Sequence, residues 1–98
     1  MSDEVTVVDN KERHRFEAHL DGALAGILTY TVQNDVVMMP HTVVEPQFEG
    51  RGIGGKLAKA ALDDAREQGQ KVAPLCPFIA AYIEKNPEYT DLVASSAV

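Results

Sequence analysis

The hydrophobic period of this 98-residue sequence changes at a cluster of glycines between Gly50 and Gly55. Before the cluster, segments such as Arg15 to Leu20 alternate polar and apolar side chains, which is typical of half-buried strands. After it, apolar residues recur at helical spacing from Ile53 onward, which is typical of an amphipathic helix. The pattern therefore predicts an α+β fold. We expect a single domain over residues 1–98, with the glycine loop at the start of the first helix.

Turn signals divide the first half of the chain into strands. Asp21-Gly22 and Asn34-Asp35 are residue pairs that close tight turns. The predicted strands are 5–8, 15–20, 24–33 and 36–44, which together make an antiparallel meander. Pro40 interrupts the last of them. Because proline donates no backbone hydrogen bond, it predicts a bulge or an unpaired edge at that point.

The second half of the chain is predicted as a helix, a short strand and a second helix. The first helix begins at Gly52 and ends at Gly69, where glycine suits a left-handed C-cap. Residues 71–76 follow as a strand that Pro74 makes irregular. The helical crossover would lay this strand parallel to the last strand of the meander. Pro77 suits the first position of the second helix. The buried stripe of that helix is predicted to be Phe78, Ile79, Tyr82 and Ile83.

Composition and charge exclude several classes of protein. The formal net charge of −6 argues against nucleic-acid binding, which needs clustered Lys and Arg. The same charge either keeps the protein soluble or attracts a basic acceptor. No apolar run approaches the roughly 20 residues of a membrane-spanning helix. We also find no metal-ligand spacing among the His, Cys and Asp residues.

The two ends of the chain and its one cysteine bear on where the protein works. Met1-Ser2-Asp3-Glu4 lacks the basic and apolar regions of a signal peptide. Cys76 is the single cysteine, so no internal disulfide forms. We therefore expect a cytoplasmic protein in a reducing compartment. Residues 95–98 are expected to fray.

The glycine cluster itself predicts a ligand. Glycines let the backbone approach a bound group closely, and a helix start offers unpaired N–H groups at the positive end of its dipole. This combination is typical of phosphate and pyrophosphate sites. The alternative is a glycine-rich turn without a ligand, although so many glycines at a helix start are costly.

Two nucleotide-binding patterns also match these letters. Gly50-x-Gly52-x-x-Gly55 fits the dinucleotide fingerprint, but too little chain follows for the βαβ units of a Rossmann domain. Gly50-x-x-x-x-Gly55-Lys56 fits most of a P-loop, but Leu57 replaces the Ser or Thr that holds magnesium. We interpret both matches as accidental.

A third pattern fits the context of strand, glycine loop and helix. Val43-Val44-Glu45-Pro46 followed by the loop resembles the acetyl-CoA motif of the GNAT superfamily of N-acetyltransferases, Gln/Arg-x-x-Gly-x-Gly/Ala. One register begins at Gln47. The register that suits the helix start better ends on Gly52 and Gly54 and places Glu49 where the family has Gln or Arg.

Three further segments sharpen the resemblance, which spans roughly residues 13–93. His41-Thr42-Val43-Val44, Leu75-Cys76-Pro77-Phe78 and Ile83-x-x-Asn86-Pro87-Glu88-Tyr89 look like those of the small YjdJ-type branch, whose members are stand-alone domains of about this length. The resemblance implies a minimal GNAT-like fold and an acetyl-CoA-dependent N-acetyltransferase. Its acceptor would be a primary amine, such as a lysine side chain or the tail of a basic protein or peptide. The alternative is a non-catalytic acetyl-CoA-binding module or sensor.

The resemblance also implies which residues bind acetyl-CoA. Backbone groups of Val43 and Val44 would bind the pantetheine arm and the acetyl carbonyl, as an added strand binds a sheet edge. The pyrophosphate would be bound by Arg51, Gly52, Gly54, Gly55 and Lys56.

Cys76 and His41 are the candidate catalytic residues. Cys76 lies at a helix start, where the pKa of a thiol falls. In one mechanism Cys76 accepts the acetyl group covalently and passes it on. In another the amine attacks acetyl-CoA directly, and the Val44 N–H polarises the carbonyl. The third interpretation is that Cys76 is only a small buried hydrophobic residue. His41 is either a general base or a structural residue. Tyr82 and Tyr89 are candidates for protonating the CoA thiolate, although the spacing of Tyr82 also suits the core.

Overall fold

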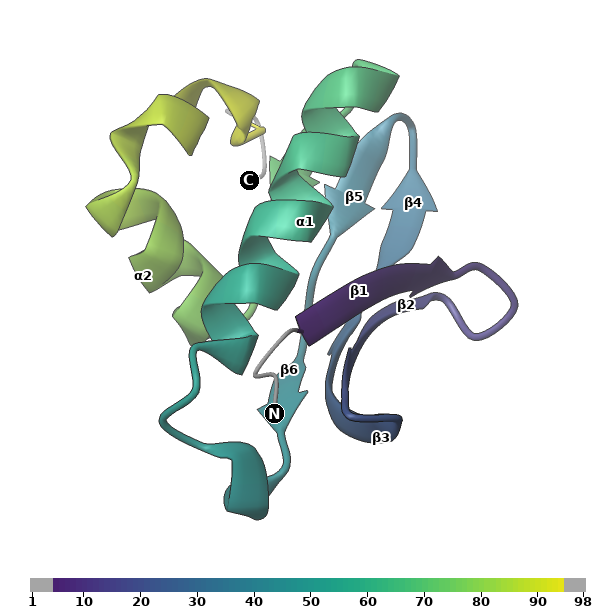
Figure 1. The fold of residues 1–98 in the computed structure, drawn as a ribbon. Coiled ribbons are helices and arrows are strands. Elements are labelled where there is room, and N and C mark those ends of the chain that lie inside the picture. The colour runs from purple at the N-terminus through teal and green to yellow at the C-terminus, as the bar shows by residue number, and fades with distance from the viewer. Residues whose placement is uncertain (1–4, 95–98) are drawn as a thin grey trace.

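The computed structural model describes residues 5–94, so the predicted fraying of residues 95–98 lies outside the described part of the chain. Figure 1 shows how the strands and helices follow one another. In chain order they are β1 (Val5–Asn10), β2 (Arg15–Leu20), β3 (Ala23–Thr29), β4 (Thr31–Gln33), β5 (Val36–Met38), β6 (Thr42–Val44), the 3-10 helix η1 (Pro46–Phe48), α1 (Ile53–Gln68), β7 (Lys71–Ala73), α2 (Pro77–Lys85) and the 3-10 helix η2 (Pro87–Leu92).

The described strands form two sheets. One is antiparallel, with the strand order β1-β2-β3-β6, and the other has the order β4-β5-β7. Strand β7 pairs in parallel with β5, which confirms the predicted crossover. The predicted continuous strands 24–33 and 36–44 are wrong, because each is divided between the two sheets. The second division matters most for the candidate site.

Pro40 is the residue at which the chain leaves one sheet for the other. Before it, the Met39 carbonyl accepts the Cys76 N–H at 2.9 Å. Pro40 has no N–H to continue this pairing. After it, the His41 carbonyl accepts the Thr29 N–H of β3 at 3.0 Å. The predicted irregularity at Pro40 is therefore a change of partner. Among residues 5–94 no backbone hydrogen bond joins β6 to residues 74–76, and we call the junction between these two segments the fork.

The other side of the fork is set by Pro74. Strand β7 ends at Ala73, earlier than the predicted end at Cys76. Pro74 lacks the N–H that would extend the pairing, and the Leu75 N–H turns back to the Ala73 carbonyl at 2.9 Å. Two prolines thus separate the strands that flank the fork.

Helix α1 covers the sheets and begins and ends at left-handed glycines. Gly52, predicted as the first helical residue, is instead the N-cap with φ 74°, and Gly69 is the C-cap with φ 73°, as predicted. The buried residues of α1 recur at helical spacing: Ile53, Gly54, Leu57, Ala58, Ala61, Leu62 and Ala65. Each fully buried Leu or Ile contributes roughly 1.5–3 kcal/mol of transfer free energy. This face therefore holds the helix on the sheets.

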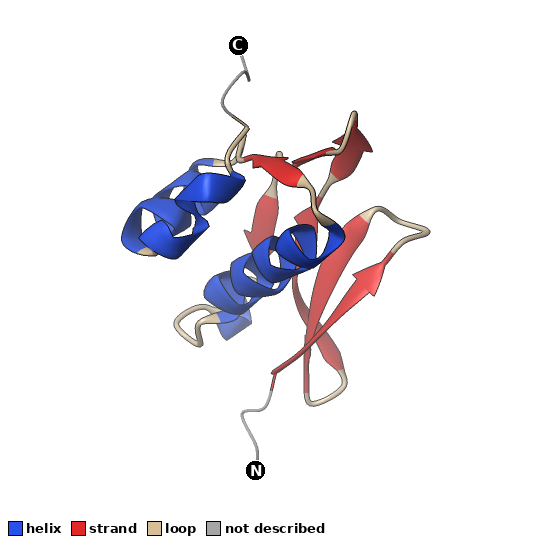
Figure 2. Cartoon of the chain, turned by 90° about the horizontal axis from the view of Figure 1, so that it is seen from above, coloured by secondary structure: helices blue, strands red, loops and turns tan. Residues whose placement is uncertain are grey.

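Helix α2 lies beside α1, on the side of α1 away from β1, β2 and β3 (Figure 2). Pro77 occupies its first turn, as predicted, and Ile79 and Ile83 are buried. Phe78 departs from the predicted stripe, since the residue is 44% exposed. The ring lies over the start of α1, against Gly54, instead of entering the core.

Candidate functional site

The first turn of α1 presents backbone N–H groups that have no partner among residues 5–94. Along α1, Lys56 is the first residue whose N–H has an acceptor, which is the Gly52 carbonyl at 3.1 Å. The N–H groups of Ile53, Gly54 and Gly55 precede it, and Gly52 has no side chain that could cap them. Unpaired N–H groups at the positive end of a helix dipole suit an anionic group such as phosphate.

Glycine is needed in this turn for two different reasons. Gly52 adopts φ +74°, a left-handed conformation that side chains rarely tolerate, although the space around its Cα is open. Gly54 has an ordinary helical backbone, but a Cβ atom there would lie 2.8 Å from the Cζ atom of Phe78. The missing side chain of Gly54 thus makes room for the Phe78 ring. At Gly55 an added Cβ would make ordinary contact with Tyr82 at 3.7 Å.

Strand β6 has one edge paired with β3 and one edge facing the fork. Hydrogen-bonded pairs alternate along an antiparallel ladder. The Thr29 N–H bonds the His41 carbonyl, and the Glu45 N–H bonds the Ala25 carbonyl at 2.8 Å. This alternation directs the backbone groups of Val43 toward β3 and those of Thr42 and Val44 toward the fork. Of the two predicted valines, Val44 is therefore the one whose N–H points away from β3 and has no partner within the described part of the chain.

Cys76 lies in the fork as the N-cap of α2, and only 7% of the residue is exposed. Burial by itself raises the pKa of the thiol. The Thr42 hydroxyl and the backbone N–H groups of Ile79, Phe78 and Thr42 outweigh burial, so the pKa of Cys76 is lowered. The structure thus surrounds this sulfur with donors that favour the thiolate.

Phe78 connects the two parts of the site. It is the second residue of α2, which Cys76 caps, and its ring lies on Gly54 in the first turn of α1. The sulfur in the fork and the first turn of α1 therefore both adjoin Phe78, the sulfur at its backbone N–H and the turn at its ring. A ligand with an anionic end and a reactive end can span both.

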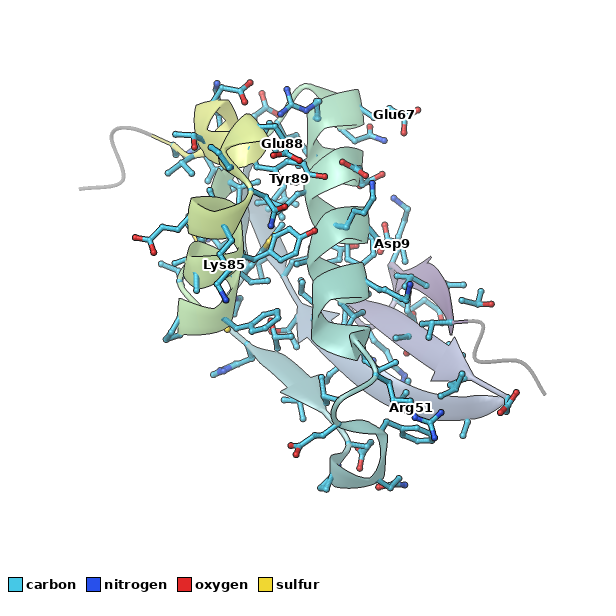
Figure 3. The ribbon with its side chains drawn as sticks, turned by 60° about the vertical axis from the view of Figure 1, so that its left-hand side comes forward. Asp9, Arg51, Glu67, Lys85, Glu88 and Tyr89 are labelled. Atoms are coloured by element: carbon cyan, nitrogen blue, oxygen red, sulfur yellow. The ribbon has the colours of Figure 1, made fainter. Side chains whose placement is uncertain are left out.

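The other predicted site residues lie around this centre. His41 is exposed and shares a strand face with Val43, opposite to the face of Thr42, so it does not face the Cys76 sulfur. Lys56 is exposed on α1. Arg51 is exposed in the loop that leads into α1 (Figure 3).

The two candidate tyrosines differ in position. Tyr82 packs beside Gly55 at the start of α1. Tyr89 is buried beside the C-terminal half of α1, where its hydroxyl donates to Asp63 at 2.7 Å (Figure 3). This hydrogen bond and burial raise the pKa of Tyr89 to about 12. An ion pair between Arg66 of α1 and Asp91 of η2, at 3.1 Å, stabilises the same contact between the two helices. Tyr89 therefore holds η2 on α1, away from the fork.

Sequence reasoning missed two residues of the site. Ile53 was assigned only to the core, yet its backbone N–H is among the unpaired groups. Thr42 was given no role, yet it faces the Cys76 sulfur with both its hydroxyl and its N–H. No motif marks Thr42. Only the register of β6 against β3 shows which residues face the fork.

Residues 5–94 contain no group of three or more His, Cys, Asp or Glu side chains arranged to hold a metal ion. None of the helices in that range is long and apolar enough to cross a membrane.

Comparison with known proteins identifies the family. Residues 15–92 match the GCN5-related N-acetyltransferase family. Protein NATD1 of Xenopus tropicalis is 35% identical, with 88% of this chain and 81% of that protein covered. Protein NATD1 of Homo sapiens is also 35% identical, with 85% of this chain and 75% of that protein covered.

Solved structures agree on the fold. A GCN5-like protein from Staphylococcus aureus superposes with a TM-score of 0.68 at 29% identity, covering 96% of this chain and 91% of that one. The ribosomal-protein-S18-alanine N-acetyltransferase of Escherichia coli shares the fold, with a TM-score of 0.64 at 20% identity over 76% of this chain and 52% of that one. The predicted minimal GNAT-like fold is confirmed. The chain belongs to the GCN5-related N-acetyltransferase family, which confirms the prediction of an acetyltransferase enzyme.

Proposed function

We propose that this protein binds acetyl-CoA across the first turn of α1 and the fork, and that it transfers the acetyl group to a primary amine. Members of its family use acetyl-CoA as the acetyl donor. The observation that carries the proposal is the contact of Phe78 with Gly54, which joins an anion site to an open strand edge and a thiol. Acetyl-CoA has a pyrophosphate at one end and a thioester at the other, so its chemistry fits this arrangement.

The pyrophosphate end is bound by the start of α1. Backbone N–H groups of Ile53, Gly54 and Gly55 donate to its oxygens, and the helix dipole favours its negative charge. The charges of Lys56 and Arg51 add to this attraction from the exposed side. These contacts come from backbone N–H groups, which do not depend on the side chain at each position. The loop can therefore bind pyrophosphate with Glu49 in place of the usual Gln or Arg.

The thioester end is bound in the fork. The unpaired edge of β6 takes the pantetheine arm as an added strand, and the Val44 N–H donates to the acetyl carbonyl oxygen. A preorganised donor stabilises the negative charge that develops on this oxygen during acyl transfer. When bound, acetyl-CoA supplies the activated acetyl group, and this chain polarises and orients it.

The acceptor amine approaches from the sheet face that carries Val43 and His41. On that face His41 is exposed, and its ring is suited to accept a proton from the ammonium group of the acceptor. His41 directly precedes β6, and because side chains alternate along extended backbone it lies on the face opposite Thr42, so His41 serves the amine and not the Cys76 thiol. The net charge of −6 favours cationic acceptors, so lysine side chains and basic peptide tails are the acceptors to test first.

The test is binding followed by turnover on the full chain. Native mass spectrometry and calorimetry with acetyl-CoA should show a one-to-one complex, and ATP and NAD should not bind. Release of CoA is then measured with a lysine-containing basic peptide, a polyamine and an acidic control peptide. Turnover with the basic acceptors supports an enzyme. Binding without turnover on any amine would indicate a binding module, and the absence of an acetyl-CoA complex would refute the proposal.

A further inference from the structure

The hydroxyl oxygen of Thr42 is buried without a hydrogen-bond partner among residues 5–94. Its exposed surface is below 1 Å². Buried hydroxyl groups nearly always have a partner, because one left without loses its hydrogen bond to water and gains nothing in return. An orphaned hydroxyl next to a candidate site therefore needs an explanation.

The group that Thr42 faces is the sulfur of Cys76. Both the hydroxyl and the backbone N–H of Thr42 favour the thiolate form of this sulfur from the β6 side of the fork. The N–H groups of Phe78 and Ile79 do so from the α2 side. Every polar group named on either side is thus able to donate to the sulfur.

The protonation state of Cys76 decides how good an acceptor its sulfur is. In the structure the Thr42 hydroxyl makes no hydrogen bond to this sulfur, and a thiol sulfur is only a weak acceptor. A thiolate is a full, charged acceptor, and a small change in side-chain torsion would let the hydroxyl donate to it. Ionisation of Cys76 therefore offers the buried hydroxyl the acceptor that it lacks.

We propose that Thr42 is a positioning residue for Cys76: its hydroxyl donates to the thiolate sulfur and holds that sulfur at the open edge of β6. The role of this position in acetyl transfer rests on the proposed function above. The pairing of the two side chains does not, and it can be measured without acetyl-CoA.

The experiment compares Thr42→Val, which removes the hydroxyl at nearly constant volume, with Thr42→Ser, which keeps it. Thr29→Val is the matched control, because Thr29 is also a threonine of this sheet, but its hydroxyl donates to the His41 carbonyl. Since Cys76 is the only cysteine, the ultraviolet absorbance of the thiolate gives its titration directly, with Cys76→Ala as the blank. Alkylation by iodoacetamide, followed by intact mass, gives its reactivity.

Thr42→Val should titrate at higher pH than wild type and should be alkylated about tenfold more slowly near neutral pH, the effect of losing one hydrogen bond to a charged group. Thr42→Ser should restore the wild-type profile, and Thr29→Val should leave it unchanged. An unchanged titration in Thr42→Val would overturn the inference. If Thr42→Val does not fold, Thr42→Ala carries the same test.

Acetyl-CoA affinity of the same variants separates this inference from the proposed function. Weaker binding with an unchanged titration would mean that the hydroxyl serves the ligand, which overturns the inference and leaves the proposed function standing. Absence of binding in wild type would refute the proposed function, while the titration would still decide whether Thr42 and Cys76 are paired.

Discussion

The ring of Phe78 lies so close to Gly54 that a Cβ atom added to this glycine would be 2.8 Å from the Cζ atom of the ring. The first turns of α1 and α2 meet at this contact. Because Cys76 caps α2 and the unpaired N–H groups lie in α1, the contact decides how far apart the two ends of the site are.

Gly54→Ala should displace the Phe78 ring and weaken acetyl-CoA binding by about tenfold or more. Phe78 as a residue is 44% exposed, so its ring can swing outward, and the free energy of unfolding should change by no more than about 1 kcal/mol. Gly55→Ala is the matched control, since its added Cβ makes only ordinary contact with Tyr82. Calorimetry and thermal unfolding of both variants test this. Equal affinities for the two variants would contradict the steric role of Gly54.

Gly52→Ala should lower both stability and acetyl-CoA affinity. An alanine held at φ +74° costs roughly 1–2 kcal/mol, and relief of that strain would re-aim the N–H groups that follow. Gly22→Ala is the matched control, because Gly22 in the β2–β3 turn also has a positive φ, +82°, and equally open surroundings. Denaturant unfolding should show similar losses in the two variants, whereas only Gly52→Ala should lose affinity. An equal loss of affinity would trace the effect to stability alone.

Val44→Pro should reduce the rate of acetyl transfer by about 10²–10³-fold while the chain still folds. Proline removes the N–H that faces the fork, and this N–H takes no part in the ladder with β3. Val43→Pro is the contrasting change, because it removes a ladder hydrogen bond to Ile27 and should destabilise the sheet. Steady-state kinetics and circular dichroism distinguish the two. Full activity in Val44→Pro would remove this N–H from the mechanism.

Glu17 should make the stability of the fold depend on acid pH. Its carboxylate accepts hydrogen bonds from Arg15 at 2.8 Å and Asn10 at 3.0 Å, which lower its pKa from 4.5 to about 2. The pKa is depressed in the folded state, so the stabilisation is fully present above about 4.5 and is lost as the pH falls from there toward 2.

Glu17→Gln should therefore flatten the stability profile between these two pH values. Urea unfolding at several pH values measures the slope. Glu12→Gln is the control, because Glu12 is exposed in the β1–β2 turn. A slope that persists in Glu17→Gln would assign the dependence to other carboxylates.

Much of the fold follows from local sequence. The helical spacing after Ile53 and the glycine at position 69 placed α1, and Pro77 placed the start of α2, because periodicity, caps and prolines act within a few residues. The glycine cluster likewise marked the helix start, whose first N–H groups have no acceptor among residues 5–94. Pro40 predicted an interruption of the strand. A local signal of this kind does not show with which strand the following residues pair.

The sequence by itself determined the α+β order, the helix ends and the positions of Cys76 and the glycine loop along the chain. Only the tertiary structure decided that residues 36–38 pair with β7 and residues 42–44 with β3, which opens the fork. It also decided that Val44 and Thr42 face the fork while His41 does not, and that Phe78 leaves the core to lie on Gly54. These outcomes depend on register and on contacts between residues far apart in the sequence. A one-residue shift in the pairing of β6 would exchange the backbone groups that face the fork, and no local pattern records that shift.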